Sequence, residues 1–358
     1  MIDFFSAYEE KSRNFTIFPR SYAIKQTKII LYGAPKSGKT SLALDLARHC
    51  NCPIFIDCAD PRFLLDSTQK TLLELFVEKR FDMLIIDNYT PTLQLPNYPK
   101  TIITSPTPMR IPESIRNNFS TQLISPLNFE EYVSFSKSAR LETIFANFLK
   151  EGNLPEILFL PEFKRLIRRQ EIITLRFKED VSIIAFLLTY QAKTFSVYNA
   201  FCHLKQYQKI SKDRIYAFIQ TMIDEGFLFL LPHANRKETK KLYFYDFSLP
   251  YALLPLPDFG AIFENLIFCE LIRRNLPISY DDTCNFILDS LAIFATPFPN
   301  PVLVESKLSA LSHPYDNVLF ISIETTKPPT KHKNGTYSII SFIDFALEYI
   351  NTLTEHYN

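Results

Sequence analysis

Residues 28–41 read Lys-Ile-Ile-Leu-Tyr-Gly-Ala-Pro-Lys-Ser-Gly-Lys-Thr-Ser. The apolar run at 28–32 predicts a short buried strand, and residues 33–40 match the pattern G-x-x-x-x-G-K-[ST]. A helical pattern of apolar residues continues from Ser41. A strand that leads through a glycine loop directly into a helix is the context that this pattern requires. The segment therefore predicts a P-loop, in which the phosphates of a nucleotide bind at the N-terminus of the helix.

The residue types in this loop have distinct chemical roles. Glycines let successive backbone N–H groups turn toward the phosphates, Lys39 reaches the β and γ phosphates, and the Thr40 hydroxyl binds Mg²⁺. The chain has six glycines in 358 residues, well below the usual share of about 7%, so Gly33 and Gly38 mark backbone positions where a side chain is not tolerated. The alternative is a chance match on a surface loop. The predicted nucleotide-binding residues are Gly33, Ala34, Pro35, Lys36, Ser37, Gly38, Lys39, Thr40 and Ser41.

The segments that follow predict the rest of a parallel sheet. Further strands are predicted at 53–57, 83–87, 101–105 and 121–124. Asp87 ends one of these strands and is predicted to hold Mg²⁺ together with Thr40; the alternative is that Asp87 only caps a turn. Thr104 is predicted to contact the γ-phosphate or the attacking water; the alternative is that Thr104 is a turn residue with no such contact.

Composition limits the class of protein. A chain of 358 residues predicts two or three domains, and 47% hydrophobic with 22% charged residues is typical of a globular protein. The net charge of +1 excludes a long-range field that draws the whole protein to nucleic acid or lipid. No apolar stretch is long enough to span a membrane, and the opening residues lack the basic segment of a secretory signal. We therefore expect a cytoplasmic protein, whose six cysteines are free thiols rather than metal ligands.

The middle of the chain predicts a second kind of domain. Residues 196–206 and 212–225 predict two helices, and 227–231 and 241–245 predict two strands. This order predicts a winged helix with a basic wing. Duplex DNA is one predicted partner, and packing between domains is the alternative. The predicted DNA contacts are Arg236, Lys237, Lys240 and Lys241.

Several motifs in a fixed order resemble the prokaryotic AAA-like P-loop ATPases, a family similar to the archaeal-type ATPases. They are the P-loop, Asp60-Pro61-Arg62, the strand that ends at Asp87, the run at 125–132 and the turn at 152–156. The resemblance covers nearly the whole chain. It implies an α/β fold with a RecA/AAA-like parallel sheet, a helical lid, a winged helix, and a C-terminal domain like the restriction endonucleases. ATP and Mg²⁺ are the implied ligands.

The chain departs from the family pattern at two places that affect catalysis. Family members usually have glutamate after the Walker B aspartate, and here Asn88 follows Asp87. An amide can position water but cannot accept its proton. Where the family tends to have Gly-Arg before the run at 125–132, this chain has Asn117-Asn118. Asp87, Asn88 and Thr104 are thus the predicted catalytic set, and hydrolysis is expected to be slow.

The last segment resembles the PD-(D/E)xK nuclease core in the order of its elements. A helix at 261–274 carries Glu264, a strand begins at Asn285, and residues 301–307 are expected to form a strand that presents Glu305 and Lys307. Asn285 stands where the pattern has a metal-binding aspartate, and a hard cation prefers an anionic oxygen. We therefore expect a degenerate fold that does not cut nucleic acid.

Together these features predict four domains and one main activity. The domains are residues 1–129 for nucleotide binding, 130–178 as a helical connector, 179–256 as the winged helix and 257–358 as the nuclease-like domain. The predicted function is a slow Mg²⁺-dependent ATPase that acts as a nucleotide-driven switch on its C-terminal domains. A DNA-binding module, or a scaffold with ATP as a structural ligand, is the alternative. ATP and GTP are not distinguished, and no partner protein is predicted.

Overall fold

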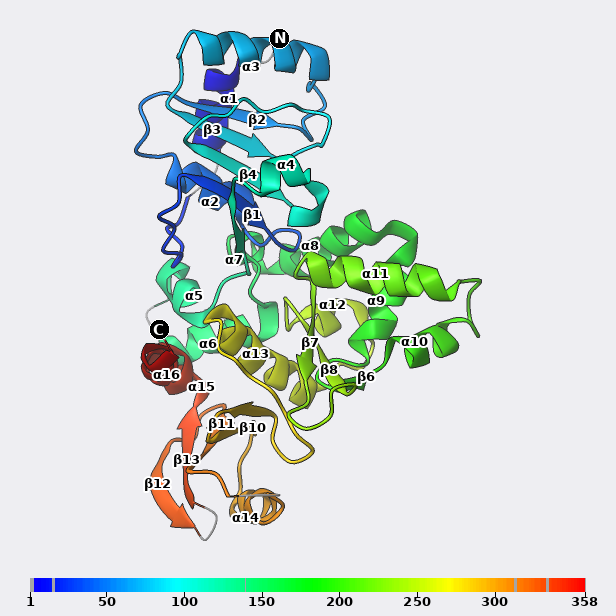
Figure 1. The fold of residues 1–358 in the computed structure, drawn as a ribbon. Coiled ribbons are helices and arrows are strands. Elements are labelled where there is room, and N and C mark those ends of the chain that lie inside the picture. The colour runs from blue at the N-terminus through cyan, green and yellow to red at the C-terminus, as the bar shows by residue number, and fades with distance from the viewer. Residues whose placement is uncertain (1–2, 15–16, 139, 312–313, 333–334, 358) are drawn as a thin grey trace. The chain divides into compact units, whose positions relative to one another are not determined.

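The computed structural model describes residues 3–14, 17–138, 140–311, 314–332 and 335–357 (Figure 1). The chain is a mixed α/β protein that divides into two compact units. The first unit holds the residues up to Ser125 together with Asp224–Phe227. The second holds 126–223 and the residues from Leu228 onward.

The first unit is built on a five-stranded parallel sheet in the order β2-β3-β4-β1-β5. Its strands are β1 (Lys28–Tyr32), β2 (Pro53–Asp57), β3 (Met83–Asp87), β4 (Thr101–Ser105) and β5 (Ser120–Leu123). Its helices are α1 (Phe4–Asn14), α2 (Lys39–Leu46), α3 (Leu65–Val77), η1 (Pro108–Arg110) and α4 (Glu113–Arg116). Strand β4 pairs with both β1 and β3, so the strand that precedes the glycine loop is separated from the strand that ends at Asp87.

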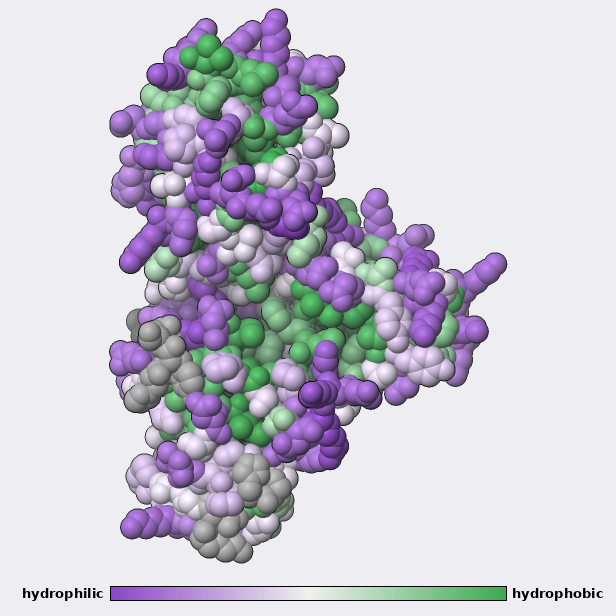
Figure 2. Space-filling view, viewed as in Figure 1, coloured by the Kyte–Doolittle hydropathy of each residue, from purple (hydrophilic) through white to green (hydrophobic). Residues whose placement is uncertain are grey.

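Apolar side chains alternate between the two faces of this sheet, as strand geometry requires. On one face Ile29 and Leu31 pack in a core with α2. On the other face Ile30 packs in a core with Leu72 and Leu75 of α3. Figure 2 shows green atoms among purple ones over α3, where Leu73 and Val77 are exposed. The sheet is thus covered on both sides, which explains the nearly continuous apolar runs of its strands.

The second unit begins with helices and a three-stranded antiparallel sheet in the order β6-β8-β7. The strands are β6 (Thr194–Phe195), β7 (Leu228–Pro232) and β8 (Lys240–Phe244). The helices are α5 (Phe129–Phe135), α6 (Leu141–Glu151), α7 (Pro155–Leu158), α8 (Glu162–Phe177), η2 (Lys178–Asp180), α9 (Val181–Leu188), α10 (Val197–Leu204), α11 (Lys212–Asp224), α12 (Leu249–Leu253) and α13 (Phe259–Arg273). The Ser196 hydroxyl accepts a hydrogen bond from the Asn199 N–H and caps α10. The helix-helix-strand-strand order expected over 196–245 is present.

The rest of the second unit contains a mixed five-stranded sheet in the order β12-β13-β11-β10-β9. The strands are β9 (Phe286–Leu288), β10 (Leu291–Ala295), β11 (Asn317–Ser322), β12 (Lys327–His332) and β13 (Gly335–Ser341). The remaining helices are α14 (Pro301–Ser309), α15 (Phe342–Asp344), η3 (Phe345–Tyr349) and α16 (Ile350–Tyr357).

The prediction of a strand at 301–307 is wrong, because these residues form the first two turns of α14. Asn300 caps the helix by accepting from the Leu303 N–H, and Pro301 occupies the first turn, where its missing N–H costs nothing. Val304 and Leu308, four residues apart, are the buried side chains of this helix. The buried side chains of this run therefore follow the spacing of a helix and not that of a strand. The N-cap at Asn300 outweighs the β propensity of the valines.

Within the described part of the chain, no helix has the length and apolar character needed to cross a membrane.

Candidate nucleotide site

The glycine loop joins β1 to α2 and needs its glycines for steric reasons. Gly33 has φ of 146°, and a Cβ on it would lie 2.5 Å from the backbone oxygen of Ile124. Gly38 is the N-cap of α2 with φ of 103°, a backbone conformation that favours glycine. The first-turn N–H groups of α2, those of Lys39 to Ser41, lack carbonyl partners within the helix. The loop thus presents a row of backbone donors at the carboxyl edge of the sheet.

The Lys39 side chain is held by backbone carbonyls of the loop, and the loop backbone is also held by a distant arginine. Lys39 Nζ donates to the carbonyls of Gly33 at 2.8 Å and Ala34 at 2.9 Å. The Ser37 hydroxyl is fully buried and has no hydrogen-bond partner among the described residues. Arg20 donates to the Ser37 carbonyl at 3.0 Å and to the Ser125 carbonyl at 2.9 Å. It therefore ties the loop to the segment that follows β5. Sequence reasoning missed Arg20, because it lies outside every motif.

Pro35 and Lys36 complete the loop, and Lys36 has φ of 63°. Its side chain is exposed and that of Pro35 is half-buried. Ser41 lies in the first turn of α2. All nine predicted residues from Gly33 to Ser41 are thus contiguous in one strand-loop-helix unit, as their spacing requires.

Asp87 is the centre of a buried polar cluster at the same edge of the sheet. The Thr40 hydroxyl donates to its two carboxylate oxygens at 2.9 and 3.0 Å, and the Thr104 hydroxyl donates to Oδ1 at 2.5 Å. Asp87 is 2% exposed. Burial raises the pKa of its carboxyl, and the hydrogen bonds from Thr104 and Thr40 oppose that shift. The structure thus brings together Thr40, Asp87 and Thr104 from α2, β3 and β4.

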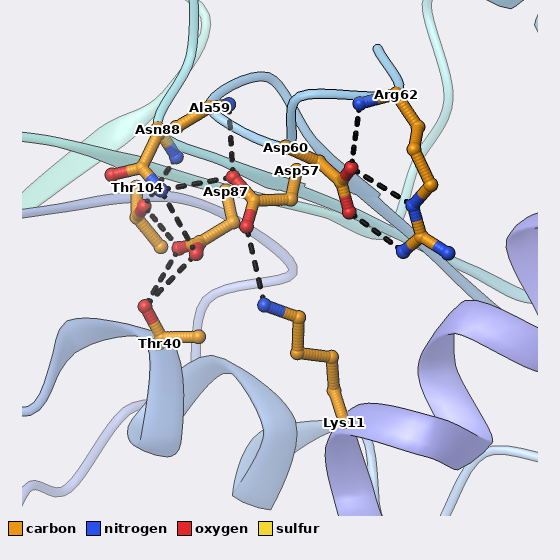
Figure 3. A network of polar contacts seen from close by, with 9 residues as sticks. All are labelled: Lys11, Thr40, Asp57, Ala59, Asp60, Arg62, Asp87, Asn88 and Thr104. Atoms are coloured by element: carbon orange, nitrogen blue, oxygen red, sulfur yellow. Dashed lines mark hydrogen bonds and ion pairs between the residues drawn. The ribbon is translucent and has the colours of Figure 1, made fainter. Parts of the chain in front are cut away.

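Asn88 links Asp87 to a second carboxylate, as Figure 3 shows. Its Nδ2 atom donates to Asp87 Oδ2 at 3.2 Å and to Asp57 Oδ1 at 3.0 Å. Its backbone N–H donates to the Thr104 hydroxyl at 2.9 Å, and its φ of 52° lies in the left-handed region that asparagine tolerates. Asp57 ends β2 in register with Asp87 and forms an ion pair with Lys11 of α1 at 3.2 Å.

Asp57 and Lys11 were not predicted as site residues. The available signal was that β2, like β3, is an apolar run ending in aspartate. The carboxyl ends of neighbouring parallel strands meet at one edge, so a second strand of that kind places a second acid there. Lys11 carried no signal, because its contact depends on how α1 packs against β2.

The four basic residues predicted to contact DNA divide into two groups in the second unit. Arg236 forms an ion pair with Asp282, and Lys241 Nζ pairs with Glu264 Oε1 at 3.0 Å. Lys237 and Lys240 are exposed. Two of the four positive charges are therefore offset by acids of the same unit.

The nuclease-like residues do not form one cluster. Asn285 Nδ2 donates to Glu264 Oε2 at 2.5 Å, while Oε1 of Glu264 accepts from Tyr243 at 2.6 Å. Glu305 is exposed on α14, where its Oε1 atom lies 3.4 Å from His332 Nε2. Lys307 Nζ lies 4.8 Å from the centre of the Phe294 ring, and burial lowers its pKa. Helical rather than strand geometry at 301–309 is the reason that Glu305 turns away.

No group of three or more His, Cys, Asp or Glu side chains among the described residues is arranged to hold a metal ion. None of the six cysteines forms a disulfide.

No family model and no curated protein matches this sequence. Among solved structures, the chain is similar to Drosophila ORC bound to AT-rich DNA and Cdc6, with 12% identity and a TM-score of 0.22 over 72% of this chain and 91% of that one. It is also similar to the Aeropyrum pernix Orc1 protein in complex with DNA, with 11% identity and a TM-score of 0.22 over 77% of this chain and 95% of that one. Both TM-scores are too low for either structure to indicate the function of this chain. The five-stranded parallel sheet and the loop at its carboxyl edge are consistent with a P-loop NTPase.

Proposed function

We propose that the chain binds ATP with Mg²⁺ at the loop of residues 33–41 and hydrolyses it slowly. The observation that carries this proposal is the contact of Thr40 Oγ1 with both oxygens of Asp87, at 2.9 and 3.0 Å. These residues are 47 positions apart and are the hydroxyl and carboxylate that hold Mg²⁺ in P-loop NTPases. The buried Ser37 hydroxyl and the glycine requirement at Gly33 fit a loop that wraps closely around phosphate.

The chain's own residues have separable roles in this proposal. Lys39 and the first N–H groups of α2 offset the charge of the phosphates. Thr40 and Asp87 hold Mg²⁺, which neutralises the charge that develops on the phosphate oxygens. Thr104 fixes Asp87 through a short hydrogen bond. Asn88 in place of glutamate leaves this position without a proton acceptor, so we expect slow turnover.

The second unit supports further parts of the proposal. We infer that α10, α11, β7 and β8 form a winged helix and that residues 257–358 form a degenerate nuclease-like domain. Nucleotide state would alter the arrangement of these domains, which makes the protein a nucleotide-driven switch. Duplex DNA is a second candidate ligand. It is favoured by two exposed lysines: Lys237, in the connection between β7 and β8, and Lys240, the first residue of β8.

The test is a titration of purified protein with labelled ATP and labelled GTP, each with and without Mg²⁺, followed by measurement of phosphate release. We expect saturable ATP binding that Mg²⁺ strengthens, with slow release of phosphate. Thr40→Val, which removes the hydroxyl but keeps a branched side chain of similar size, is expected to remove the Mg²⁺ dependence. Equal binding with and without Mg²⁺ in the unaltered protein would contradict the assignment of Thr40 and Asp87.

A further inference from the structure

The acids at and just beyond the carboxyl edge of the parallel sheet differ in the groups that contact them. Asp87 accepts hydrogen bonds from Thr40 and Thr104, and in the proposed function it holds Mg²⁺. Asp60 forms two hydrogen bonds with the Arg62 guanidinium, at 3.0 and 2.8 Å, and the Arg62 hydrogen bonds lower its pKa to about 2. Asp87 therefore has a role as a metal ligand in the proposed function, and Asp60 is paired with Arg62.

Asp57 is in a different position. It ends β2 directly opposite Asp87 in the parallel register, and its side chain is 13% exposed. Its Oδ1 atom accepts from Asn88 Nδ2 at 3.0 Å and from the Ala59 N–H at 2.9 Å. Its Oδ2 atom accepts from Lys11 Nζ at 3.2 Å. The carboxylate is thus oriented from three sides (Figure 3).

Asn88 holds the Asp57 carboxylate in place relative to Asp87, the proposed metal-binding residue. One amide group donates to both Asp57 and Asp87, so the two side chains are held at the same edge of the sheet. A glutamate at position 88 would place a like charge beside both aspartates. The asparagine that removes the usual proton acceptor therefore also bridges the two carboxylates.

We propose that Asp57 is the general base of the reaction, in place of the glutamate that position 88 lacks; the proposal rests on the ATPase function proposed above. The oxygen of a water molecule attacks the γ-phosphorus, and one proton of that water passes to a carboxylate oxygen of Asp57. The bond between the γ-phosphorus and the β–γ bridging oxygen breaks, and its electron pair leaves with ADP. Asp57 then returns its proton to solvent. Lys11 and Asn88 are positioning residues that hold the carboxylate.

The test compares Asp57→Asn with Asp60→Asn, a matched control three residues away whose side chain pairs with Arg62. Single-turnover phosphate release is measured at saturating Mg²⁺ and ATP, and ATP affinity is measured separately. A positioned general base contributes about 10²- to 10⁴-fold, so Asp57→Asn is expected to slow release by that factor. Asp60→Asn is expected to stay within about threefold of the unaltered protein.

Two further variants separate chemistry from folding. Asp57→Glu keeps the carboxylate and is expected to retain far more activity than Asp57→Asn. The double variant Asp57→Asn with Asn88→Glu is expected to regain release, because it restores a carboxylate at the neighbouring position. An equal loss in Asp57→Glu and Asp57→Asn, or full activity in Asp57→Asn, would overturn the assignment.

Failure of this inference and failure of the proposed function give different results. If the unaltered protein does not bind ATP, the proposed function is wrong. If it binds and slowly hydrolyses ATP, and Asp57→Asn releases phosphate at the same rate, the proposed function stands and the role of Asp57 is refuted. If it binds ATP but releases no phosphate, only nucleotide binding stands.

Discussion

Removing the ammonium group of Lys39 tests the nucleotide site most directly. Lys39 Nζ donates to two carbonyls of the glycine loop, those of Gly33 and Ala34, so the cation is held inside the loop. Loss of a hydrogen bond that involves a charged group costs about 1.5–3 kcal/mol. Because about 1.4 kcal/mol corresponds to a tenfold change in affinity, we expect Lys39→Ala to bind ATP roughly 10- to 150-fold more weakly.

The same substitution is expected to leave the fold intact. Two carbonyls lose a partner at a half-buried position, which costs about 0.5–1.5 kcal/mol each. Removing a positive charge from the N-terminus of α2 regains about 0.3–1 kcal/mol. The net loss of about 0–3 kcal/mol corresponds to a fall in melting temperature of at most roughly 10 °C for a domain of this size.

The assay is a fluorescence titration with ATP at constant Mg²⁺, accompanied by a melting curve. Lys100→Ala is the matched control, because it removes the same charge from an exposed residue just before β4, at the amino edge of the sheet. We expect its affinity to be unchanged. Unchanged affinity in Lys39→Ala, or an equal loss in both variants, would refute the P-loop assignment.

Four other predictions follow from named contacts. Because the Asn88 amide holds Asp57, Asn88→Glu alone is expected not to speed phosphate release; a gain of about tenfold or more would show that position 88, and not Asp57, supplies the base. If duplex DNA binds at the exposed Lys237 and Lys240 alone, the slope of log affinity against log salt is expected near −1.8, from about 0.9 per phosphate. A gel-shift series that gives twice this slope would contradict the assumption that only two lysines contact phosphates. Burial raises the pKa of Glu270 to about 7, so the folded state binds more protons than the unfolded state. The free energy of unfolding should therefore fall by about 3 kcal/mol as pH rises from 4.5 to 7, and urea unfolding of Glu270→Gln should lose this dependence. Plasmid nicking with Mg²⁺ or Mn²⁺ is expected to be absent, and Asn285→Asp alone should not create it, because Glu305 is exposed on α14 beside His332; nicking by the unaltered protein would refute the degenerate-nuclease assignment.

The first unit shows how far local sequence reasoning reaches. The P-loop and the strand ending at Asp87 were predictable, because a glycine loop between a strand and a helix uses residues that are adjacent in the chain. The partners of the site were less predictable. Arg20 reaches the loop from a segment without a motif, and Lys11 reaches Asp57 only because α1 packs beside β2.

The second unit shows where such reasoning fails. The run at 301–307 has the composition of a buried strand, and its helical state depends on the Asn300 cap and on which side chains the neighbouring sheet can bury. That difference moved Glu305 away from Glu264. Asn285 in turn donates a hydrogen bond to Glu264, a role that a metal-binding aspartate could not have.

By itself, the sequence determined the parts of this protein that depend on neighbouring residues: the conformation of the glycine loop, the start of α2 and the burial of the strands. Steric limits on φ and hydrogen-bonding periodicity act over a few residues, so they can be read directly. The tertiary structure decided which distant groups meet. Asp57, Asp87 and Asn88 share one edge because strands β2 and β3 pair in parallel register, and pairing between strands is a long-range choice that no local pattern encodes.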